Sequence, residues 1–181
     1  MGGVVHTQDN GLTWRREHLP NVLPGHGPLA INAFNPSVVW ASVNLQSSFY
    51  RTVDGGATWS QPIPTLGGEN DIDDICAAAA DTVWGVLNLN TAGQIFLIHL
   101  NSDGAFTKQA FNPASGYRYE GVTCLDELTA WVVGIKGHAV APGQPSGIIL
   151  YTVDGGAHWA TQPLPVAGAE LWKVSFVGTP R

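Results

Sequence analysis

This sequence of 181 residues contains little positive charge. Only 12% of the residues are charged, with eight Lys or Arg against 14 Asp or Glu, and the formal net charge is −6. Nucleic acids and anionic membrane surfaces are bound through dense basic patches. The composition therefore argues against nucleic acid and membrane as main partners.

Long apolar runs and metal-binding patterns are missing as well. No run approaches the length of a membrane-spanning helix, and Met1-Gly2-Gly3 does not begin a signal peptide. Neither a signal nor a span is expected, and the cellular compartment stays open because a trimmed chain would have lost any signal. The two cysteines and six histidines show no metal-ligand spacing, so we expect no metal and no cofactor.

Glycine, proline and tryptophan are plentiful instead, with 22, 12 and 7 residues respectively. This composition suits many short strands joined by tight turns, and it predicts an all-β fold with almost no helix. The length suffices for one well-buried core.

Three stretches of the sequence share one pattern, and a fourth shares it more weakly. They are Thr7-Gln-Asp9-Asn-Gly11-Leu-Thr13-Trp14, Thr52-Val-Asp54-Gly-Gly56-Ala-Thr58-Trp59, Thr152-Val-Asp154-Gly-Gly156-Ala-His158-Trp159 and the weaker Asn101-Ser-Asp103-Gly-Ala105-Phe-Thr107. The copies begin at residues 7, 52, 101 and 152, so the period is 45 to 51 residues. This is the size of one β-propeller blade.

Each residue type in the pattern has a local structural task. Asp followed by Gly favours a hairpin turn, because the carboxylate accepts backbone N–H bonds and Gly tolerates positive φ. Thr adds hydroxyl hydrogen bonds, and Trp carries apolar surface into the space between neighbouring sheets. We therefore expect structural roles for Thr7, Asp9, Gly11, Trp14, Thr52, Asp54, Gly56, Trp59, Asp103, Thr152, Asp154, Gly156 and Trp159. Calcium binding or catalysis at Asp9, Asp54 or Asp154 is the alternative.

The pattern resembles the Asp-box, or BNR, repeat of sialidases, certain glucanases, sortilin-type receptors and photosystem II assembly factors. Ala130-Trp131-Val-Val-Gly134, followed by Gly147-Ile-Ile-Leu-Tyr151-Thr152-Val-Asp154-Gly-Gly, is most similar to repeats of the photosystem II assembly-factor type. The resemblance implies a β-propeller of four-stranded antiparallel blades, with the motif on the turn between the third and fourth strands, away from the active face.

Apolar runs between the motifs predict one propeller domain, or a fragment of one, over residues 1–181. We expect a partial blade at 1–20, blades at 30–64, 74–112 and 121–165, and at 170–181 the first strand of a next or closing blade, centred on residues 171–177. Because the ends lack a second strand, the unit is expected to be a piece of a larger propeller, a partner-completed homo-oligomer, or a closed four-bladed ring. Cys76 and Cys124 fall at similar inner positions, where buried free thiols are favoured over a bridge.

Function is expected on the face that carries the interblade loops and the loops between second and third strands. There Tyr117, Arg118 and Tyr119 form a candidate binding segment that would stack on a sugar or on a partner's side chain, unless it is a solvated connection with one buried tyrosine. His138 in the loop 136–147 and His26 are further binding candidates on this face.

Asp71, Asp73 and Asp74 form an acidic cluster on the same face. Neighbouring carboxylates can share a proton, bind Ca²⁺ or supply the acid and base of a glycosidase. They are weak catalytic candidates, and a solvated interblade turn is the alternative.

The sequence favours a non-catalytic module that binds a protein or a glycan through its loop face. Sialidases bring three arginines for the substrate carboxylate, an Arg-Ile-Pro segment and a Tyr–Glu nucleophile pair, whereas this chain has only five arginines and no Arg-Ile-Pro segment. Glucanases of this type need two separated aspartates in a longer cleft. The basic surface expected of a photosystem chaperone is also missing. A carbohydrate-active enzyme, or a piece of one, and a purely structural assembly unit stay as alternatives.

Overall fold

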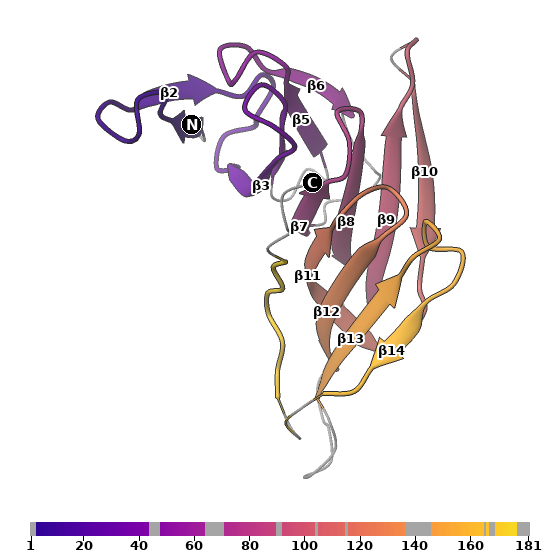
Figure 1. Ribbon diagram of the computed structural model, residues 1–181. Helices are drawn as coiled ribbons and strands as arrows, with labels where there is room; N and C mark the ends of the chain where they lie inside the picture. The colour runs from indigo at the N-terminus through magenta and orange to yellow at the C-terminus, as the bar shows by residue number, and fades with distance from the viewer. Residues whose placement is uncertain are drawn as a thin grey trace.

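The computed structural model describes residues 3–43, 48–63, 71–89, 92–103, 105–114, 116–136, 146–164, 166 and 169–176. These residues form β-strands and no helix, arranged as one two-stranded and three four-stranded antiparallel sheets (Figure 1). No helix in the described part of the chain could span a membrane.

Strands follow one another outward within each sheet, in chain order. The N-terminal hairpin consists of β1 (Gly3–His6) and β2 (Arg15–His18). Blade 1 consists of β3 (Pro28–Ala33), β4 (Val39–Val43), β5 (Ser48–Thr52) and β6 (Ser60–Ile63). Blade 2 consists of β7 (Ile72–Ala77), β8 (Thr82–Leu89), β9 (Ala92–Leu100) and β10 (Phe106–Phe111). Blade 3 consists of β11 (Tyr117–Cys124), β12 (Ala130–Lys136), β13 (Gly147–Thr152) and β14 (Ala160–Gln162).

The first strand of each blade lies beside the first strand of the next, since β7 contacts both β3 and β11. The blades therefore stack face to face around their inner strands, as in a β-propeller. The prediction of an all-β propeller built from four-stranded antiparallel blades is confirmed.

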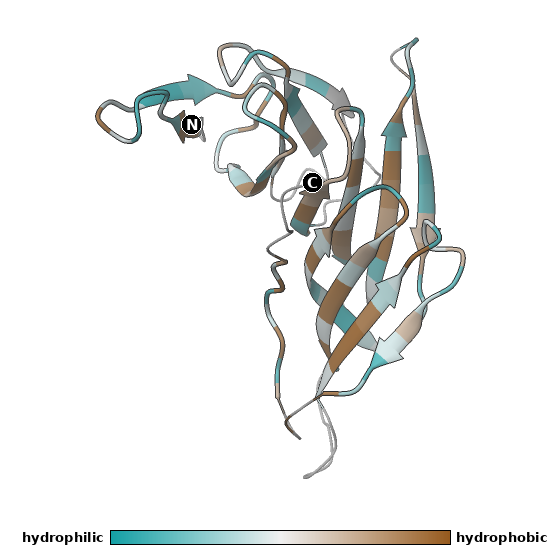
Figure 2. Ribbon diagram, in the orientation of Figure 1, coloured by the Kyte–Doolittle hydropathy of each residue, from teal (hydrophilic) through white to brown (hydrophobic). Residues whose placement is uncertain are grey.

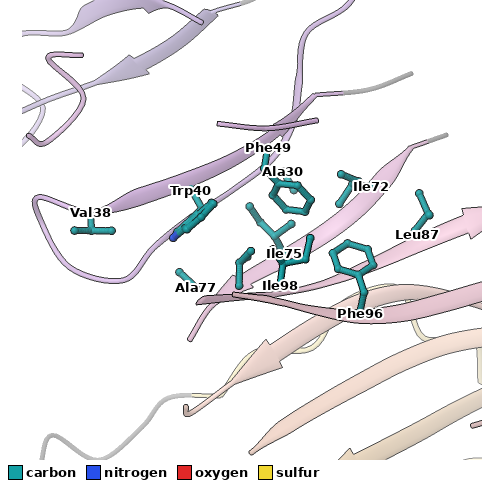
Figure 3. Close-up of a cluster of buried hydrophobic side chains, with 11 residues drawn as sticks. Ala30, Val38, Trp40, Phe49, Ile72, Ile75, Ala77, Leu87, Phe96 and Ile98 are labelled. Atoms are coloured by element: carbon teal, nitrogen blue, oxygen red, sulfur yellow. The ribbon is translucent and has the colours of Figure 1, made fainter. Parts of the chain in front are cut away.

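The core lies between blades rather than within them. In Figure 3, Trp40 and Phe49 of blade 1 lie beside Ile75 and neighbouring apolar side chains of blade 2, and Val38 lies at the edge of the cluster. Apolar residues consequently dominate the middle strands, which are covered on both faces (Figure 2). Burying such side chains contributes about 1.5–3 kcal/mol each.

Each inner strand carries a β-bulge near its beginning. The register shifts between Pro28 and Ala30, between Ile72 and Asp74, and between Tyr119 and Gly121. The extra residues are Leu29, Asp73 and Glu120. A bulge re-aims the side chain of the extra residue, so two acidic side chains receive equivalent positions in neighbouring blades.

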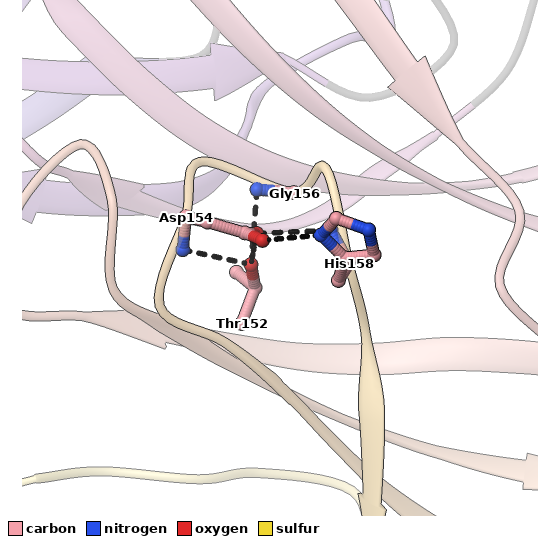
Figure 4. Close-up of polar contacts among 4 residues, drawn as sticks. All are labelled: Thr152, Asp154, Gly156 and His158. Carbon is pink, nitrogen blue, oxygen red and sulfur yellow. Dashed lines mark hydrogen bonds and ion pairs between the residues drawn. The ribbon is translucent and has the colours of Figure 1, made fainter.

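Three copies of the repeated pattern form the same hydrogen-bonded turn. In Figure 4, the Thr152 hydroxyl donates to Asp154 Oδ1 at 2.8 Å and accepts the N–H of Gly156 at 3.0 Å, while Asp154 accepts the N–H of His158 at 2.9 Å. Gly156 has φ of 87°, in the left-handed region where a side chain is strained. The turns at Asp9 and Asp54 have the same Thr–Asp hydrogen bonds.

The weak fourth copy differs from these turns. The strand β9 continues to Leu100, and Asp103 accepts the N–H of Ala105 at 2.9 Å in the turn of the long hairpin that β9 forms with β10 (Figure 1). Strand pairing places His99 where blades 1 and 3 have Val53 and Val153.

The tryptophans that follow the turns do not all lie between sheets. Trp159 packs on blade 2, and Trp59 packs on the cluster that joins blade 1 to the hairpin. Trp14 is 62% exposed, so the prediction that it is buried between sheets is wrong.

Cys76 and Cys124 form a disulfide between β7 and β11, with Cα atoms 5.9 Å apart. The prediction of free thiols is therefore wrong. The two residues are not equivalent in their blades, because Cys76 lies opposite Trp84 and Cys124 lies opposite Ala130. This offset brings them together across the interblade boundary.

The segment 171–176 forms no strand, which corrects the prediction of a first strand there. It lies alongside β11, since a Cβ on Gly121 would meet the Cα of Lys173 at 3.1 Å. The ring of Phe176 packs on Trp131 with centroids 4.2 Å apart. The described part of this segment therefore packs on blade 3 but does not pair with another strand. Val177 lies outside the described residues.

Candidate functional site

The candidate site forms where β7 and β11 begin and β8 ends. Because the strands are antiparallel, these three ends share one face of the molecule, opposite the repeated turns. The bulges at Asp73 and Glu120 lie at this edge of the two inner strands. The fold thus brings together two groups that the sequence analysis treats separately, the acidic cluster and the segment from Tyr117 to Glu120.

Asn88, near the end of β8, connects the two blades at this site. Its amide nitrogen donates to Asp73 Oδ2 and to the carbonyl oxygen of Tyr119, both at 2.9 Å. Its amide oxygen accepts the N–H of Tyr119 at 3.0 Å. The side-chain amide thus satisfies both backbone groups of Tyr119, directly before the bulge. Sequence reasoning missed Asn88, for which the only signal is a polar residue within the apolar run of β8.

Arg118 and Glu120 supply opposite charges beside Asp73. Arg118 Nε lies 3.3 Å from Glu120 Oε1, and the glutamate side chain is buried. Burial raises the pKa of Asp73 to about 6, and the negative charge of Glu120 adds to this shift. The hydrogen bond from Asn88 and the positive charge of Arg118 act in the opposite direction. Asp73 therefore changes charge close to neutral pH.

Asp74 has a different role from its neighbour. One carboxylate oxygen accepts the N–H of Val122 at 3.0 Å, and the other lies 2.7 Å from Lys173 Nζ. It therefore joins β7 to β11 and to the C-terminal segment. Asp71 lies close enough for its charge to affect Asp73, although its contribution is the smallest.

The two tyrosines of the candidate segment separate in the structure. Tyr119 is fully buried, and its hydroxyl donates to the carbonyl oxygen of Ala114 at 3.0 Å. It supports the loop and presents no ring for a ligand to stack on. Tyr117 is partly exposed, and Lys136 Nζ lies 5.9 Å from the centre of its ring.

Tyr117 also borders a pocket of about 480 Å³, and it directly precedes Arg118 in β11. The other lining residues come from the beginning of β13 and the end of β14 and include Gly147, Ile148, Thr161, Pro163 and Leu164. A ligand on this face could contact the apolar pocket at Tyr117 and the charged cluster that begins at the next residue of β11. Such a combination fixes both the position and the orientation of a bound group.

Comparison with known proteins places the fold of this chain among β-propellers. No family model matches the chain. It is 24% identical to the photosystem II assembly lipoprotein Ycf48 of Synechococcus sp. (strain CC9902), over 90% of this chain and 57% of that protein. Its fold is similar to the GH74 enzyme of Niastella koreensis (TM-score 0.57, 16% identity, 83% of this chain and 25% of that chain) and to Ycf48 bound to D1 peptide (TM-score 0.54, 16% identity, 74% of this chain and 40% of that chain).

These likenesses support the predicted relation to β-propeller proteins, and the two structural ones show the fold alone. The chain spans only 57% of the length of the curated relative, and smaller shares of the two solved chains.

Of the remaining predicted binding residues, only His26 lies in the described part of the chain. His26 lies in the connection between the hairpin and blade 1, where its N–H donates to the carbonyl oxygen of Leu23 at 3.1 Å. His138 lies outside the described residues. The site that the structure describes therefore consists of Asp73, Asn88, Tyr117, Arg118 and Glu120, held by Asp74 and Tyr119.

Proposed function

We propose that this chain is a non-catalytic β-propeller module that binds a segment of a partner protein through the face containing Asp73, Arg118 and Glu120. The observation that carries the proposal is the bridge that Asn88 makes between Asp73 and Tyr119. It holds a charged cluster from two blades, one residue along β11 from Tyr117, which borders the apolar pocket. The same assignment takes the repeated turns as Asp-box turns with a purely structural role.

The relatives add support of two kinds. The curated relative is named as an assembly lipoprotein of photosystem II, and the solved Ycf48 chain is bound to a peptide of D1. Carried to this chain, these names favour protein recognition. The names of the relatives do not identify the partner of this chain, because the chain spans only part of each relative and the sequence identities are low.

The chemistry of the site defines the kind of segment it would take. Asp73 and Glu120 favour a ligand that offers N–H or ammonium donors, and the overall charge of −6 favours a basic segment. The pocket at Tyr117 would receive an apolar side chain next to that donor. We therefore propose a peptide that pairs a basic residue with a nearby apolar one.

The test is selection of a random peptide library displayed on phage against the folded chain. We expect enriched peptides to combine Lys or Arg with an apolar residue, and we expect Tyr117→Ala to weaken their binding at least about tenfold, which corresponds to about 1.4 kcal/mol. Asp103→Asn, on the opposite face, is the matched control and should leave the affinity unchanged. An enriched peptide that binds the Tyr117→Ala protein as tightly as the unchanged chain would overturn the proposal.

One observation favours a second function, glycoside hydrolysis. A carboxyl group whose pKa is raised to about 6 beside a second carboxylate is suited to donate a proton to a leaving oxygen. The fold likeness to a GH74 enzyme is compatible with this chemistry. Hydrolysis of a β-glucan by the chain, abolished in Asp73→Asn, would replace the first proposal with this one.

Pairing with a second copy stays a separate prediction. Light scattering on a sizing column over a range of concentrations measures the mass of the particle. A discrete dimer would mean that the loop face belongs to the dimer as a whole, and the peptide selection should then use the dimer. A monomer would make the single chain the binding unit.

A further inference from the structure

A second polar cluster lies between blades 2 and 3 on the face opposite the candidate site. Asp81 comes from the turn between β7 and β8, His99 from the end of β9, and Glu127 from the turn between β11 and β12. One potential ligand atom of each residue lies within 4.8 Å of the other two. The cluster therefore draws on three turns that are distant in sequence.

The buried hydroxyl of Thr82 contacts all three side chains and fixes their roles. It lies 2.7 Å from Glu127 Oε1, 2.8 Å from His99 Nδ1 and 3.3 Å from Asp81 Oδ1. A hydroxyl donates one proton, and the short contact to Glu127 is its best acceptor. The hydroxyl oxygen then accepts from His99 Nδ1, so the proton of a neutral His99 is on Nδ1.

That assignment leaves His99 Nε2 unprotonated, with a lone pair free for a ligand. The distance from Nε2 to Asp81 Oδ2 is 3.9 Å, too long for a hydrogen bond and short enough for both atoms to lie about 2.1 Å from one Zn²⁺. Both side chains are 46% exposed, so an ion can reach them.

We propose that Asp81, His99 and Glu127 bind one divalent transition-metal ion, with Zn²⁺ as the probe. One imidazole with two carboxylates is a donor set that Zn²⁺ accepts, and Thr82 acts as the outer partner that orients the imidazole. The ion would connect blade 2 to blade 3.

Comparison of the three blades shows that blade 2 departs from the repeat at this cluster. His99 occupies the position of Val53 and Val153 in the other two blades, and those valines are 57% and 63% exposed. Blade 2 also lacks the Thr–Asp hydrogen bonds that brace the corresponding turns of blades 1 and 3. Of the three described blades, blade 2 is the one whose turn lacks these hydrogen bonds, and the polar cluster lies at this blade.

The backbone around the cluster is fixed by further hydrogen bonds. Leu100 N–H donates to the carbonyl oxygen of Asp81 at 2.8 Å, which ties the first turn to the end of β9. Trp84 Nε1 donates to the carbonyl oxygen of Asp126 at 3.2 Å, which ties the turn of blade 3 to blade 2. These contacts hold the three turns together before any ion arrives.

The experiment is a Zn²⁺ titration of the full chain in competition with a chromophoric chelator, paired with thermal unfolding with and without Zn²⁺. His99→Val installs the residue that the other blades use, and Glu127→Gln removes one charged ligand while keeping an acceptor for Thr82. His158→Thr is the matched control, because His158 also lies beside an aspartate, at 2.7 Å, but has Thr58 as its counterpart in blade 1.

We expect one Zn²⁺ per chain, an increase in unfolding temperature with Zn²⁺, and affinity at least about tenfold weaker in both His99→Val and Glu127→Gln. His158→Thr should bind as the unchanged chain does. Equal affinity of the His99→Val protein and the unchanged chain would overturn the proposal, and so would an equal loss in His158→Thr. Circular dichroism without metal establishes that each variant is folded, so that a loss of binding reports on the site.

Discussion

Trp84 of β8 and Trp159, which follows the turn between β13 and β14, meet edge to face with ring centroids 5.9 Å apart. The ring centroid of Phe111 of β10 lies 5.9 Å from that of Trp84 and 6.0 Å from that of Trp159, with tilted ring planes in both pairs. The three rings join blade 2 to blade 3, because Trp159 reaches back from one blade onto the preceding one. This packing direction explains how a residue at a turn can contribute to the core.

Replacing Trp159 with Ala should therefore destabilise the protein by about 3 kcal/mol, since the change removes the ring from between two blades. Trp14→Ala is the comparison, because Trp14 has the same place in the repeat but is 62% exposed. We expect that change to cost less than about 0.5 kcal/mol. Urea unfolding measures the stability of both variants, provided that the unfolding free energy of each depends equally steeply on urea concentration. Equal losses of stability would show that the two rings have the same environment.

Opening the disulfide between Cys76 and Cys124 should also weaken the junction of blades 2 and 3. The bridge closes a loop between residues 48 apart in sequence, and removing such a constraint costs about 2–4 kcal/mol. We expect the double variant Cys76→Ala, Cys124→Ala to unfold at lower urea concentration than the oxidised chain. Reductant should lower the midpoint of the unchanged chain and leave that of the double variant in place. A midpoint of the unchanged chain that does not respond to reductant would contradict a stabilising bridge.

The aspartates of the repeated turns should make stability depend on acid pH. Hydrogen bonds from Thr58 and Thr52 lower the pKa of Asp54 to about 2, and the pKa of Asp9 and of Asp154 is lowered to about 2 in the same manner. A carboxylate with a lowered pKa stabilises the fold above its ordinary value of about 4, and this contribution is lost as the pH falls toward 2.

Asp54→Ala should accordingly lower the unfolding temperature at pH 7, and its difference from the unchanged chain should narrow between pH 4 and pH 2. Asp103→Ala is the control, because the carboxylate of Asp103 accepts from Ala105 in a turn without the Thr–Asp bonds. Thermal unfolding across this range measures both. A difference that stays constant with pH would assign the effect of Asp54 to packing instead of charge.

The parts of this structure that sequence predicts are those that repeat locally. The turns at Asp9, Asp54 and Asp154 depend on residues within four positions of one another, so their pattern is visible in the chain. The blade period then gives the all-β propeller. Trp14 shows the limit of that reasoning, because whether a ring is buried depends on the sheet beside it and not on its own turn.

The candidate site depends on contacts that the period does not encode. Asn88 is 31 residues from Tyr119, and their hydrogen bonds arise only once β8 and β11 pack together. The bulge at Asp73 and the offset that lets Cys76 meet Cys124 are likewise matters of strand register. A sequence pattern placed the acidic cluster and the Tyr117 segment on the same face, but not in contact.

The last prediction concerns Asp73. Its pKa is shifted upward on folding, whereas the pKa of each turn aspartate is shifted downward. An acid whose pKa is raised to about 6 on folding binds its proton more tightly in the folded chain than in the unfolded chain. Its contribution therefore favours the fold below pH 4, decreases as the pH rises from about 4 to about 6, and stays at its lowest above that. Burial beside Glu120 makes the ionised carboxylate costly.

Asp73→Asn keeps the shape of the protonated acid and removes the charge. We expect it to be more stable than the unchanged chain at pH 7, by about 1–3 kcal/mol, with the difference vanishing below pH 4. Urea unfolding at pH 3.5, 5 and 7 measures this profile, and Asp103→Asn provides an exposed control. A variant less stable than the unchanged chain at pH 7 would mean that Arg118 stabilises the Asp73 carboxylate by more than burial and Glu120 destabilise it.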